Sequence, residues 1–327
     1  MRMRTLTLFL ALVLLGGCGR PSGVVPLPTP SPVEPTPIAI PSVSPTAAIA
    51  LPSTAELSAP SRDVVWALIA GELFRSLDGG NTWRQTTTPP VRNNAVSFAN
   101  ANEGWVLATG SPATQCMQQP ATIWHTADAG ATWQDLGAGG IAARQCKSWI
   151  SFIDTRHGFV SAWDPNTPAI IYATTDGGLS WTASAPLPDP PGQTTAGSVS
   201  SLVASRVGRA DGRLYVAASG WQQSYVYVSD NGGANWSHLV KLPNAATMAS
   251  MSFVDARHWW LSAEGGTRVT SDGGVTWRPS TGPQFAAPIA PVITFADSSV
   301  GYATVRGGIQ RTNDGGATWT AIRTPGT

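Results

Sequence analysis

One eight-residue pattern occurs six times in this 327-residue chain and constrains its fold more than any other feature. Each copy approximates Ser/Thr-x-Asp-x-Gly-x-Thr-Trp, and the copies follow one another at roughly even intervals. The third positions of the six copies are Asp78, Asp128, Asp176, Asn231, Asp272 and Asp314. A short pattern repeated at this interval predicts a fold in which one supersecondary unit recurs along the chain.

The residue types of this pattern are those of a tight turn between two strands. The Asp carboxylate can accept local backbone N–H bonds, Gly tolerates positive φ, and the Ser or Thr hydroxyl adds a weaker local bond. Asn231 can accept the same bonds through its amide oxygen. The Trp that ends each copy begins the next strand and can cover the turn with a large apolar face. We therefore assign a structural role, and no chemistry, to the six third-position residues.

Aromatic residues repeat with the same period upstream of each turn. They are Trp66, Trp105, Phe159, Tyr215, Trp260 and Tyr302. A Phe stands seven residues before four of them, in a short alternating segment, at positions 98, 152, 253 and 295. Each unit therefore reads as four strands, and a unit of about 44 residues falls in the ~40–50 residue range of propeller blades. We predict an all-β, six-bladed β-propeller of four-stranded antiparallel blades.

The six turns resemble the Asp-box, or BNR, motif, and the match extends over most of residues 61–327. The longer pattern Phe-x-Asp…Gly-Trp…Thr-x-Asp-Gly-Gly-x-Thr-Trp is similar to the photosystem II stability/assembly factor-like repeats. This resemblance implies a non-catalytic propeller that holds a membrane-protein partner during its maturation. Members of that family often have seven blades, so a seven-bladed ring is an alternative.

Blade 1 poses a problem of ring closure, because no Phe stands seven residues before Trp66. Either residues 49–59 supply the missing inner strand, or this blade has only three strands. An unpaired inner edge is costly, so we favour the first alternative.

The N-terminus reads as an export signal followed by a tether. Arg2 and Arg4 precede an apolar run over 6–15, which is too short to span a membrane as a helix. The sequence Leu15-Gly-Gly-Cys18 resembles a bacterial lipoprotein signal, which implies removal of residues 1–17 and lipidation of Cys18; a plain secretory signal is the alternative. Residues 18–60 are rich in Pro, Ser and Thr and contain no aromatic residue, which predicts an extended tether before a propeller over 61–327. The expected location is the cell envelope, anchored to the membrane and extracytoplasmic.

Composition excludes several classes of partner. The chain has 20 Lys+Arg and 19 Asp+Glu, for a formal net charge of +1, so no electrostatic surface for nucleic acid is indicated. Four scattered His residues and one acid per turn indicate neither zinc nor strong calcium ligation. We expect a monomer without metal or cofactor.

The topology of a four-stranded meander separates two rims. One rim carries the Asp-box turns, and the other (here the insertion rim) carries the irregular connections, which are the usual location for recognition. The aromatic and polar residues that we expect to bind a protein or a glycan there are Arg144, Trp149, Trp163, Trp221 and Gln222. For each single Trp, packing between blades is the alternative. Cys116 and Cys146 also fall on this rim, and export predicts a disulfide between them, with two free thiols as the alternative.

An enzyme is the competing interpretation, because Asp-boxes also occur in six-bladed sialidases. No Arg-Ile-Pro motif is present, and Glu34 and Glu56 fall in the predicted tether. Other glycoside hydrolases need two carboxylates, ~5–10 Å apart. Asp135, Asp164 and Glu264 are the only candidates outside the repeat. We therefore predict a binding or assembly scaffold, with sialidase-like or other glycosidase activity as the alternative.

Overall fold

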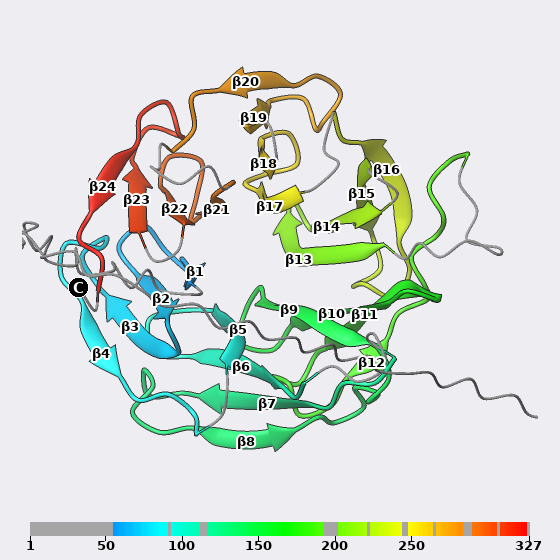
Figure 1. Cartoon of the computed structure of the whole chain (residues 1–327), viewed down its shortest axis with the longest axis horizontal. Helices are drawn as coiled ribbons and strands as arrows, with labels where there is room; N and C mark the ends of the chain where they lie inside the picture. Colours follow the sequence, from blue (N-terminus) through cyan, green and yellow to red (C-terminus); the bar gives the residue numbers. More distant parts are fainter. Residues whose placement is uncertain are drawn as a thin grey trace, which may run out of the picture. The chain divides into compact units, whose positions relative to one another are not determined.

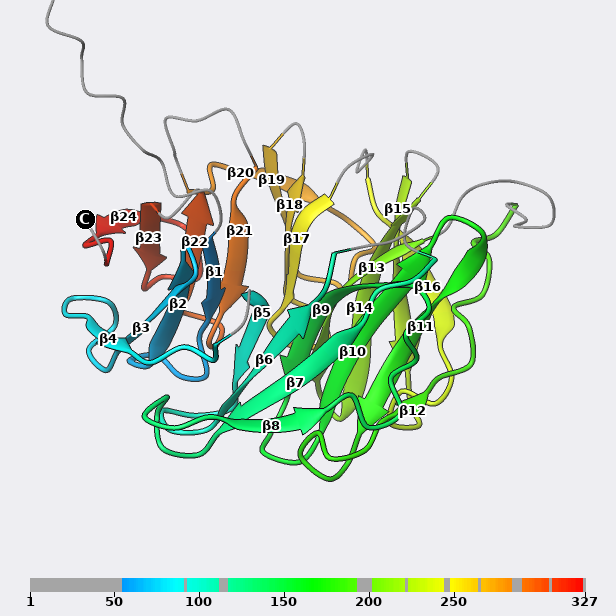
Figure 2. The same ribbon diagram turned by 60° about the horizontal axis from the view of Figure 1, so that its bottom comes forward.

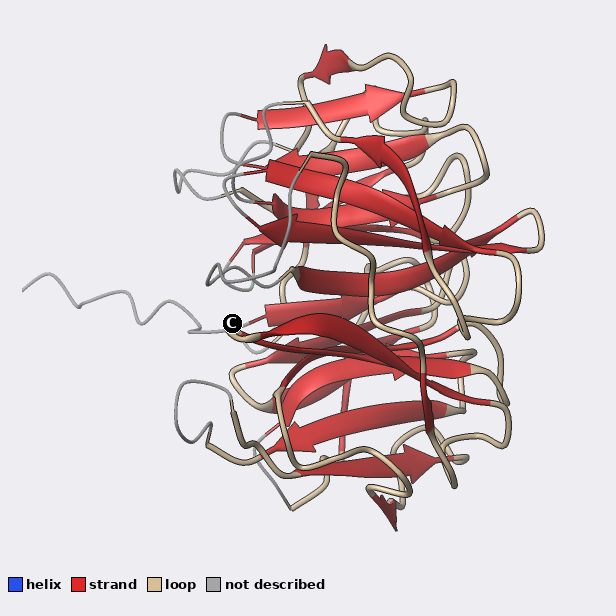
Figure 3. Cartoon of the chain, turned by 90° about the vertical axis from the view of Figure 1, so that its right-hand side faces the viewer, coloured by secondary structure: helices blue, strands red, loops and turns tan. Residues whose placement is uncertain are grey.

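The structure is a computed structural model, which describes the chain from Ala55 to Pro325 with eight internal gaps. The described ranges are 55–90, 93–111, 117–192, 202–220, 223–243, 248–263, 266–283, 290–305 and 308–325. They form six four-stranded antiparallel sheets, arranged as blades around a central channel (Figure 1). The predicted six-bladed β-propeller is confirmed, and the seven-bladed alternative is wrong. Within these ranges there is no helix long and apolar enough to cross a membrane, and Figure 3 shows only strands and loops.

Each blade is a meander of four consecutive strands that runs outward from the channel. Blade 1 contains β1 (Ala55–Ser58), β2 (Val65–Ile69), β3 (Glu72–Ser76) and β4 (Arg84–Thr86). Blade 2 contains β5 (Asn93–Phe98), β6 (Gly104–Thr109), β7 (Ala121–Thr126) and β8 (Gln134–Gly137). Blade 3 contains β9 (Cys146–Phe152), β10 (Gly158–Asp164), β11 (Thr167–Thr174) and β12 (Thr182–Ala183).

The second half of the ring repeats the same arrangement, and Figure 2 shows its strands beside those of the first half. Blade 4 contains β13 (Val203–Ala210), β14 (Arg213–Gly220), β15 (Gln223–Ser229) and β16 (Ser237–Lys241). Blade 5 contains β17 (Met248–Phe253), β18 (Trp259–Ala263), β19 (Gly266–Thr270) and β20 (Arg278–Ser280). Blade 6 contains β21 (Val292–Phe295), β22 (Gly301–Val305), β23 (Gly308–Thr312) and β24 (Thr320–Ile322).

The periodic aromatic residues pack the blades against one another. At four of the six seams, the aromatic residue on the second strand of one blade stacks on the Phe of the next blade's inner strand. Trp66 and Phe98 have ring centroids 3.7 Å apart, and Trp105 and Phe152 have centroids 3.6 Å apart. Tyr215–Phe253 and Trp260–Phe295 repeat this stacked arrangement at later seams. Such pairs explain why the sequence repeats aromatic residues at both positions, since burial and ring stacking together hold adjacent sheets in register.

Serine hydroxyl groups accept hydrogen bonds from backbone N–H groups at the open edge of the inner strands. The backbone N–H of Phe98 donates to Ser58 Oγ of the preceding blade at 2.9 Å, and that of Phe152 donates to Ser97 Oγ at 2.8 Å. Equivalent bonds run from Val207 to Ser151 and from Phe295 to Ser252, both at 3.1 Å. An inner edge strand has a row of backbone groups without a ladder partner, and these serines bind part of that row.

The seam between blades 4 and 5 departs from this pattern. Gly208 pairs with Tyr215 as Ser97 pairs with Trp105, so a glycine occupies the serine position of blade 4. A Cβ at this glycine would lie 2.9 Å from the ring of Phe253. The close approach of this ring therefore takes the place of the hydroxyl bond at this seam.

The ring closes by side-chain and backbone contacts between blades 1 and 6. The Trp83 indole N–H donates to the Arg323 carbonyl, and the Tyr302 hydroxyl donates to the Arg62 carbonyl, both at 2.8 Å. Strand β1 completes blade 1, which confirms that residues within 49–59 supply the inner strand. The propeller therefore begins inside the segment 18–60 that was predicted as tether, and the prediction that Glu56 belongs to the tether is wrong. The reason is compositional: β1 has no aromatic residue, so its sequence resembles that of the tether.

The Asp-box turns are closed by their own side chains. Asp78 accepts the Thr82 backbone N–H at 2.8 Å and the Thr82 hydroxyl at 2.7 Å, and Gly80 N–H donates to Ser76 Oγ at 2.8 Å. The Thr or Ser hydroxyl is the main reason that the pKa falls to about 2 in five of these carboxyl groups, those of Asp78, Asp128, Asp176, Asp272 and Asp314. In the fourth box, the amide oxygen of Asn231 accepts the Asn235 N–H at 3.0 Å. The Asp-box carboxylates thus stabilise the turns in which they lie.

Candidate functional site

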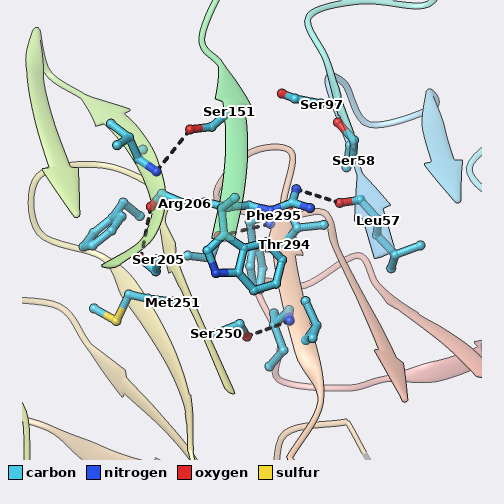
Figure 4. A pocket seen from close by; sticks show the side chains of 18 of the residues that line it. Leu57, Ser58, Ser97, Ser151, Ser205, Arg206, Ser250, Met251, Thr294 and Phe295 are labelled. Atoms are coloured by element: carbon cyan, nitrogen blue, oxygen red, sulfur yellow. Dashed lines mark hydrogen bonds between the residues drawn. The ribbon is translucent and has the colours of Figure 1, made fainter. Parts of the chain in front are cut away.

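The central channel contains a cavity of about 600 Å³ (Figure 4). Inner strands of all six blades line it. Representative lining residues are Leu57, Ser58, Ser97, Ser151, Ser205, Arg206, Ser250, Met251, Thr294 and Phe295. The wall is therefore a mixture of hydroxyl groups and apolar side chains.

An ion pair crosses this channel. Arg206 of β13 places Nη2 2.8 Å from Oε2 of Glu56, which belongs to β1 in blade 1, and Nη1 donates to the Leu57 carbonyl at 3.1 Å. Its guanidinium carbon also lies 5.1 Å from the ring centroid of Trp149 on β9. Blades 1 and 4 lie on opposite sides of the ring in Figure 1. The three side chains thus join three blades through the centre of the propeller.

The electrostatics of the cavity follow from this pair. Burial is the main effect on Glu56 and raises the pKa of its carboxyl group, while the charge of Arg206 and the N–H bond from Val96 act in the opposite direction. The other residues that line the cavity are uncharged. The cavity therefore presents one cation whose charge is balanced by a neighbouring carboxylate.

The predicted binding residues do not form a single group. Trp149 lines the channel and stacks with Arg206, so the prediction that it belongs to the rim is wrong. Trp163 is half-buried at the end of β10, where its backbone pairs with Cys146, and Arg144 is exposed in the connection between β8 and β9. Trp221 and Gln222 lie outside the described residues.

A buried lysine fixes the insertion rim between blades 2 and 3. Lys147 Nζ donates to the carbonyls of Gln119, Arg144 and Gln145 at 2.7, 3.0 and 2.9 Å. Burial lowers the pKa of this lysine to about 8. An isolated bridge between Gln118 and Arg144 joins the same two connections. We call residues 117–120 and 143–147 the lysine platform; sequence reasoning missed it, although Lys147 is one of only two lysines in the chain.

The predicted disulfide has one member inside this platform. Cys146 is buried at the start of β9, whereas Cys116 lies outside the described residues. The Gln145 N–H donates to the Met117 carbonyl at 3.3 Å, so the residues next to the two cysteines are hydrogen-bonded. The disulfide remains a prediction. Cys18, residues 1–17 and the tether up to residue 54 also lie outside the described residues.

The candidate catalytic acids are separated and engaged in local turns. Asp164 is buried in the β10–β11 hairpin, where it accepts the N–H groups of Asn166 and Thr167 at 2.7 and 2.8 Å and also the Thr167 hydroxyl. Asp135 is exposed on β8 and accepts the Gly137 N–H at 2.7 Å. Neither residue lines the channel cavity, and Glu264 lies outside the described residues. Asp135 and Asp164 thus belong to different blades and separate turns.

Ligand groups for a metal ion are also dispersed over the part of the chain that the structure describes. No three His, Cys, Asp or Glu side chains gather there in a way that could hold an ion. The channel cavity offers hydroxyl groups, aromatic rings and one balanced ion pair.

Comparison with known proteins places the chain among β-propellers. The family described as the DUF6242 beta propeller domain matches residues 192–326. A xyloglucanase from Paenibacillus sp is 25% identical over an alignment of 261 residues, and the match covers 65% of this chain and 24% of the xyloglucanase. The chain therefore spans about a quarter of the length of this relative.

Solved structures give the same fold. YCF48 from Cyanidioschyzon merolae superposes with a TM-score of 0.52 and 18% identity, over 83% of this chain and 85% of YCF48. The Hadza microbial sialidase Hz136 superposes with a TM-score of 0.52 and 16% identity, over 82% of this chain and 65% of the sialidase. At these identities the likeness shows the propeller fold and does not choose between a binding protein and a glycosidase.

Proposed function

We propose that this chain is a non-catalytic binding scaffold of the cell envelope, which holds a protein partner on its insertion rim. In this proposal, a lipid on Cys18 anchors the chain to the membrane, and residues 19–54 carry the propeller on the extracytoplasmic side. The lipoprotein-like signal and the resemblance to photosystem II stability/assembly factor-like repeats support this assignment. The likeness to YCF48 is consistent with it at the level of the fold.

The observation that carries the proposal is the lysine platform. Three carbonyls around one buried ammonium fix two connections that would otherwise be long and irregular. The platform presents the exposed side chain of Arg144. The backbone of Trp163, whose side chain is half-buried, pairs with Cys146 of the platform. Arg and Trp are the residue types that most often dominate binding energy at protein interfaces, and a pre-organised surface reduces the entropy cost of binding.

The alternative is a glycosidase or a glycan-binding propeller, which the likenesses to a xyloglucanase and a sialidase favour. Hydrolysis needs two carboxylates on either side of the scissile bond. Asp135 and Asp164 are each bonded by their own turn, and Glu56 is paired with Arg206. Because Asp135 and Asp164 belong to different blades and Glu56 is balanced by Arg206, we place the binding function first.

Site-specific photo-cross-linking in intact cells tests the proposed rim. A photoreactive amino acid at position 163 or 144 is expected to capture a discrete protein partner. The same amino acid at Leu179 or Val275, which are 61% and 78% exposed on the Asp-box rim, is the matched control and is expected to capture none. The captured partner is then purified, and its affinity is measured for the wild type and for Trp163→Ala and Arg144→Ala.

Two results would contradict the proposal. One is a partner that cross-links from positions 179 and 275 but not from 163 and 144. The other is turnover of sialosides or xyloglucan that is lost in Asp164→Asn, because it would show that the acid in the β10–β11 hairpin performs chemistry. Turnover that persists in Asp164→Asn would be tested next in Asp135→Asn and Glu264→Gln, the other two candidate acids, and its loss there would equally contradict the proposal.

A further inference from the structure

We propose that the channel cavity is a separate binding site for a small uncharged saccharide, independent of any partner on the insertion rim. Its volume of about 600 Å³ lies within the ~300–1,000 Å³ range of small-molecule sites. Three features of the cavity wall favour such a ligand: its charge, its unused hydroxyl protons and its apolar surfaces.

The charge of the cavity wall disfavours an ionic ligand. Among the described residues, Arg206 is the only charged one that lines the cavity, and Glu56 already balances it at 2.8 Å. A ligand carboxylate would have to replace Glu56 at the guanidinium and leave that buried side chain unpaired, which is strongly unfavourable. An ammonium group would meet a carboxylate that is already shared between Arg206 and the Val96 N–H. The cavity is therefore suited to an uncharged molecule.

The hydroxyl groups give the cavity its hydrogen-bonding character. Ser58, Ser97 and Ser151 each use Oγ to accept a backbone N–H of the next blade. Within the described ranges, the hydroxyl groups of these three serines donate no hydrogen bond. The Thr294 hydroxyl neither donates nor accepts one there. Since a hydroxyl can both donate and accept, these groups can bind a ligand without breaking the bonds between blades. They come from the consecutive blades 6, 1, 2 and 3, so a matching ligand needs acceptors along much of its perimeter.

Apolar surfaces lie between the hydroxyl groups. The lining includes Phe295, the indole of Trp149 and the more deeply buried Met251. A pyranose ring combines polar oxygens around its perimeter with apolar C–H faces, so it satisfies both kinds of surface at once. A flexible peptide would present fewer perimeter oxygens and would lose more conformational entropy on entry.

The test uses the full chain and titration calorimetry with four named probes. Xylotriose and maltotriose are the uncharged sugars, sialyllactose is the charged sugar, and N-acetyl-trialanine amide represents an uncharged peptide. We expect a trisaccharide without charge to bind and sialyllactose not to bind. Thr294→Val removes one hydroxyl from the wall with little change of shape and should weaken sugar binding by about tenfold.

Thr320→Val is the matched control, because Thr320 is exposed on the outer strand β24. It should leave both the affinity and the unfolding temperature unchanged, and Thr294→Val should also leave the unfolding temperature close to that of the wild type. Absence of binding by both uncharged sugars at millimolar concentration would overturn the inference. So would tighter binding of sialyllactose or of the blocked peptide, or sugar binding that Thr294→Val weakens no more than Thr320→Val does.

Discussion

Glu56 and Arg206 come from blades on opposite sides of the ring, and their side chains meet 2.8 Å apart in the central channel. Glu56 also accepts the Val96 N–H of blade 2, and Arg206 also stacks on Trp149 of blade 3. One contact therefore couples four blades. Because β1 is only four residues long and is the first described strand, this contact holds the start of the propeller in place.

Removal of one partner of this pair should destabilise the protein more than removal of both. Arg206→Met leaves the Glu56 carboxylate buried without its cation, and we expect a loss of about 3 kcal/mol in the free energy of unfolding. The double variant Glu56→Gln/Arg206→Met should recover much of that loss, since no buried charge remains. Urea unfolding of the three proteins measures the difference. Equal losses in the single and double variants would show that packing of the arginine, and not its charge, stabilises the channel.

Serine bonds between inner strands should also contribute measurably to stability. Ser97→Ala removes the acceptor of the Phe152 N–H, which would be left buried without a partner. We expect a loss of about 1–2 kcal/mol in the free energy of unfolding, measured by urea titration. Ser237→Ala is the control, because Ser237 is exposed on β16, and it should have little effect. If Ser97→Ala behaved like this control, the hydroxyl bonds would have no part in holding the blades together.

The six turns should make the propeller sensitive to acid. Five of their carboxyl groups have a pKa of about 2, below the ordinary value of 3.8. A lowered folded-state pKa stabilises the protein above the unfolded value, and this contribution is lost as the pH falls from about 4 towards about 2. Asp272→Asn should therefore reduce the dependence of the free energy of unfolding on pH in this window, and Asn231→Asp should increase it. Unchanged slopes in both variants would mean that the turn hydrogen bonds do not favour the ionised form.

The predicted disulfide can be tested on the intact chain. Mass spectrometry of the non-reduced protein should find Cys116 and Cys146 in one cross-linked peptide. The Cys116→Ser/Cys146→Ser variant should lose ~3 kcal/mol in the free energy of unfolding, as expected for a closed loop of this size. Two alkylatable thiols in the native, non-reduced protein would refute the prediction.

The sequence predicted the features that repeat and missed those that occur once. The Asp-box turns and the aromatic pairs such as Trp66–Phe98 recur in the chain, so their spacing revealed both the strands and the blade count. The ion pair between Glu56 and Arg206 joins blades that are not adjacent, and no local pattern indicates such a contact. Trp149 was expected on the rim because the alternation of a single strand does not show which face meets the channel. The lysine platform depends on hydrogen bonds between two irregular connections, which belong to no repeated pattern.

Lys147 allows a further test, because its burial predicts the direction in which the free energy of unfolding changes with pH. Burial lowers its pKa from 10.5 to about 8, so between these values the unfolded chain binds more protons than the folded protein. The contribution of Lys147 to the free energy of unfolding should therefore rise with pH across this window. This rise should disappear in Lys147→Met and persist in Lys241→Met, in which an exposed lysine of β16 is replaced. A rise that survives in Lys147→Met would show that the ammonium is not buried in the platform, and the rigid surface on which the proposed function depends would lose its support.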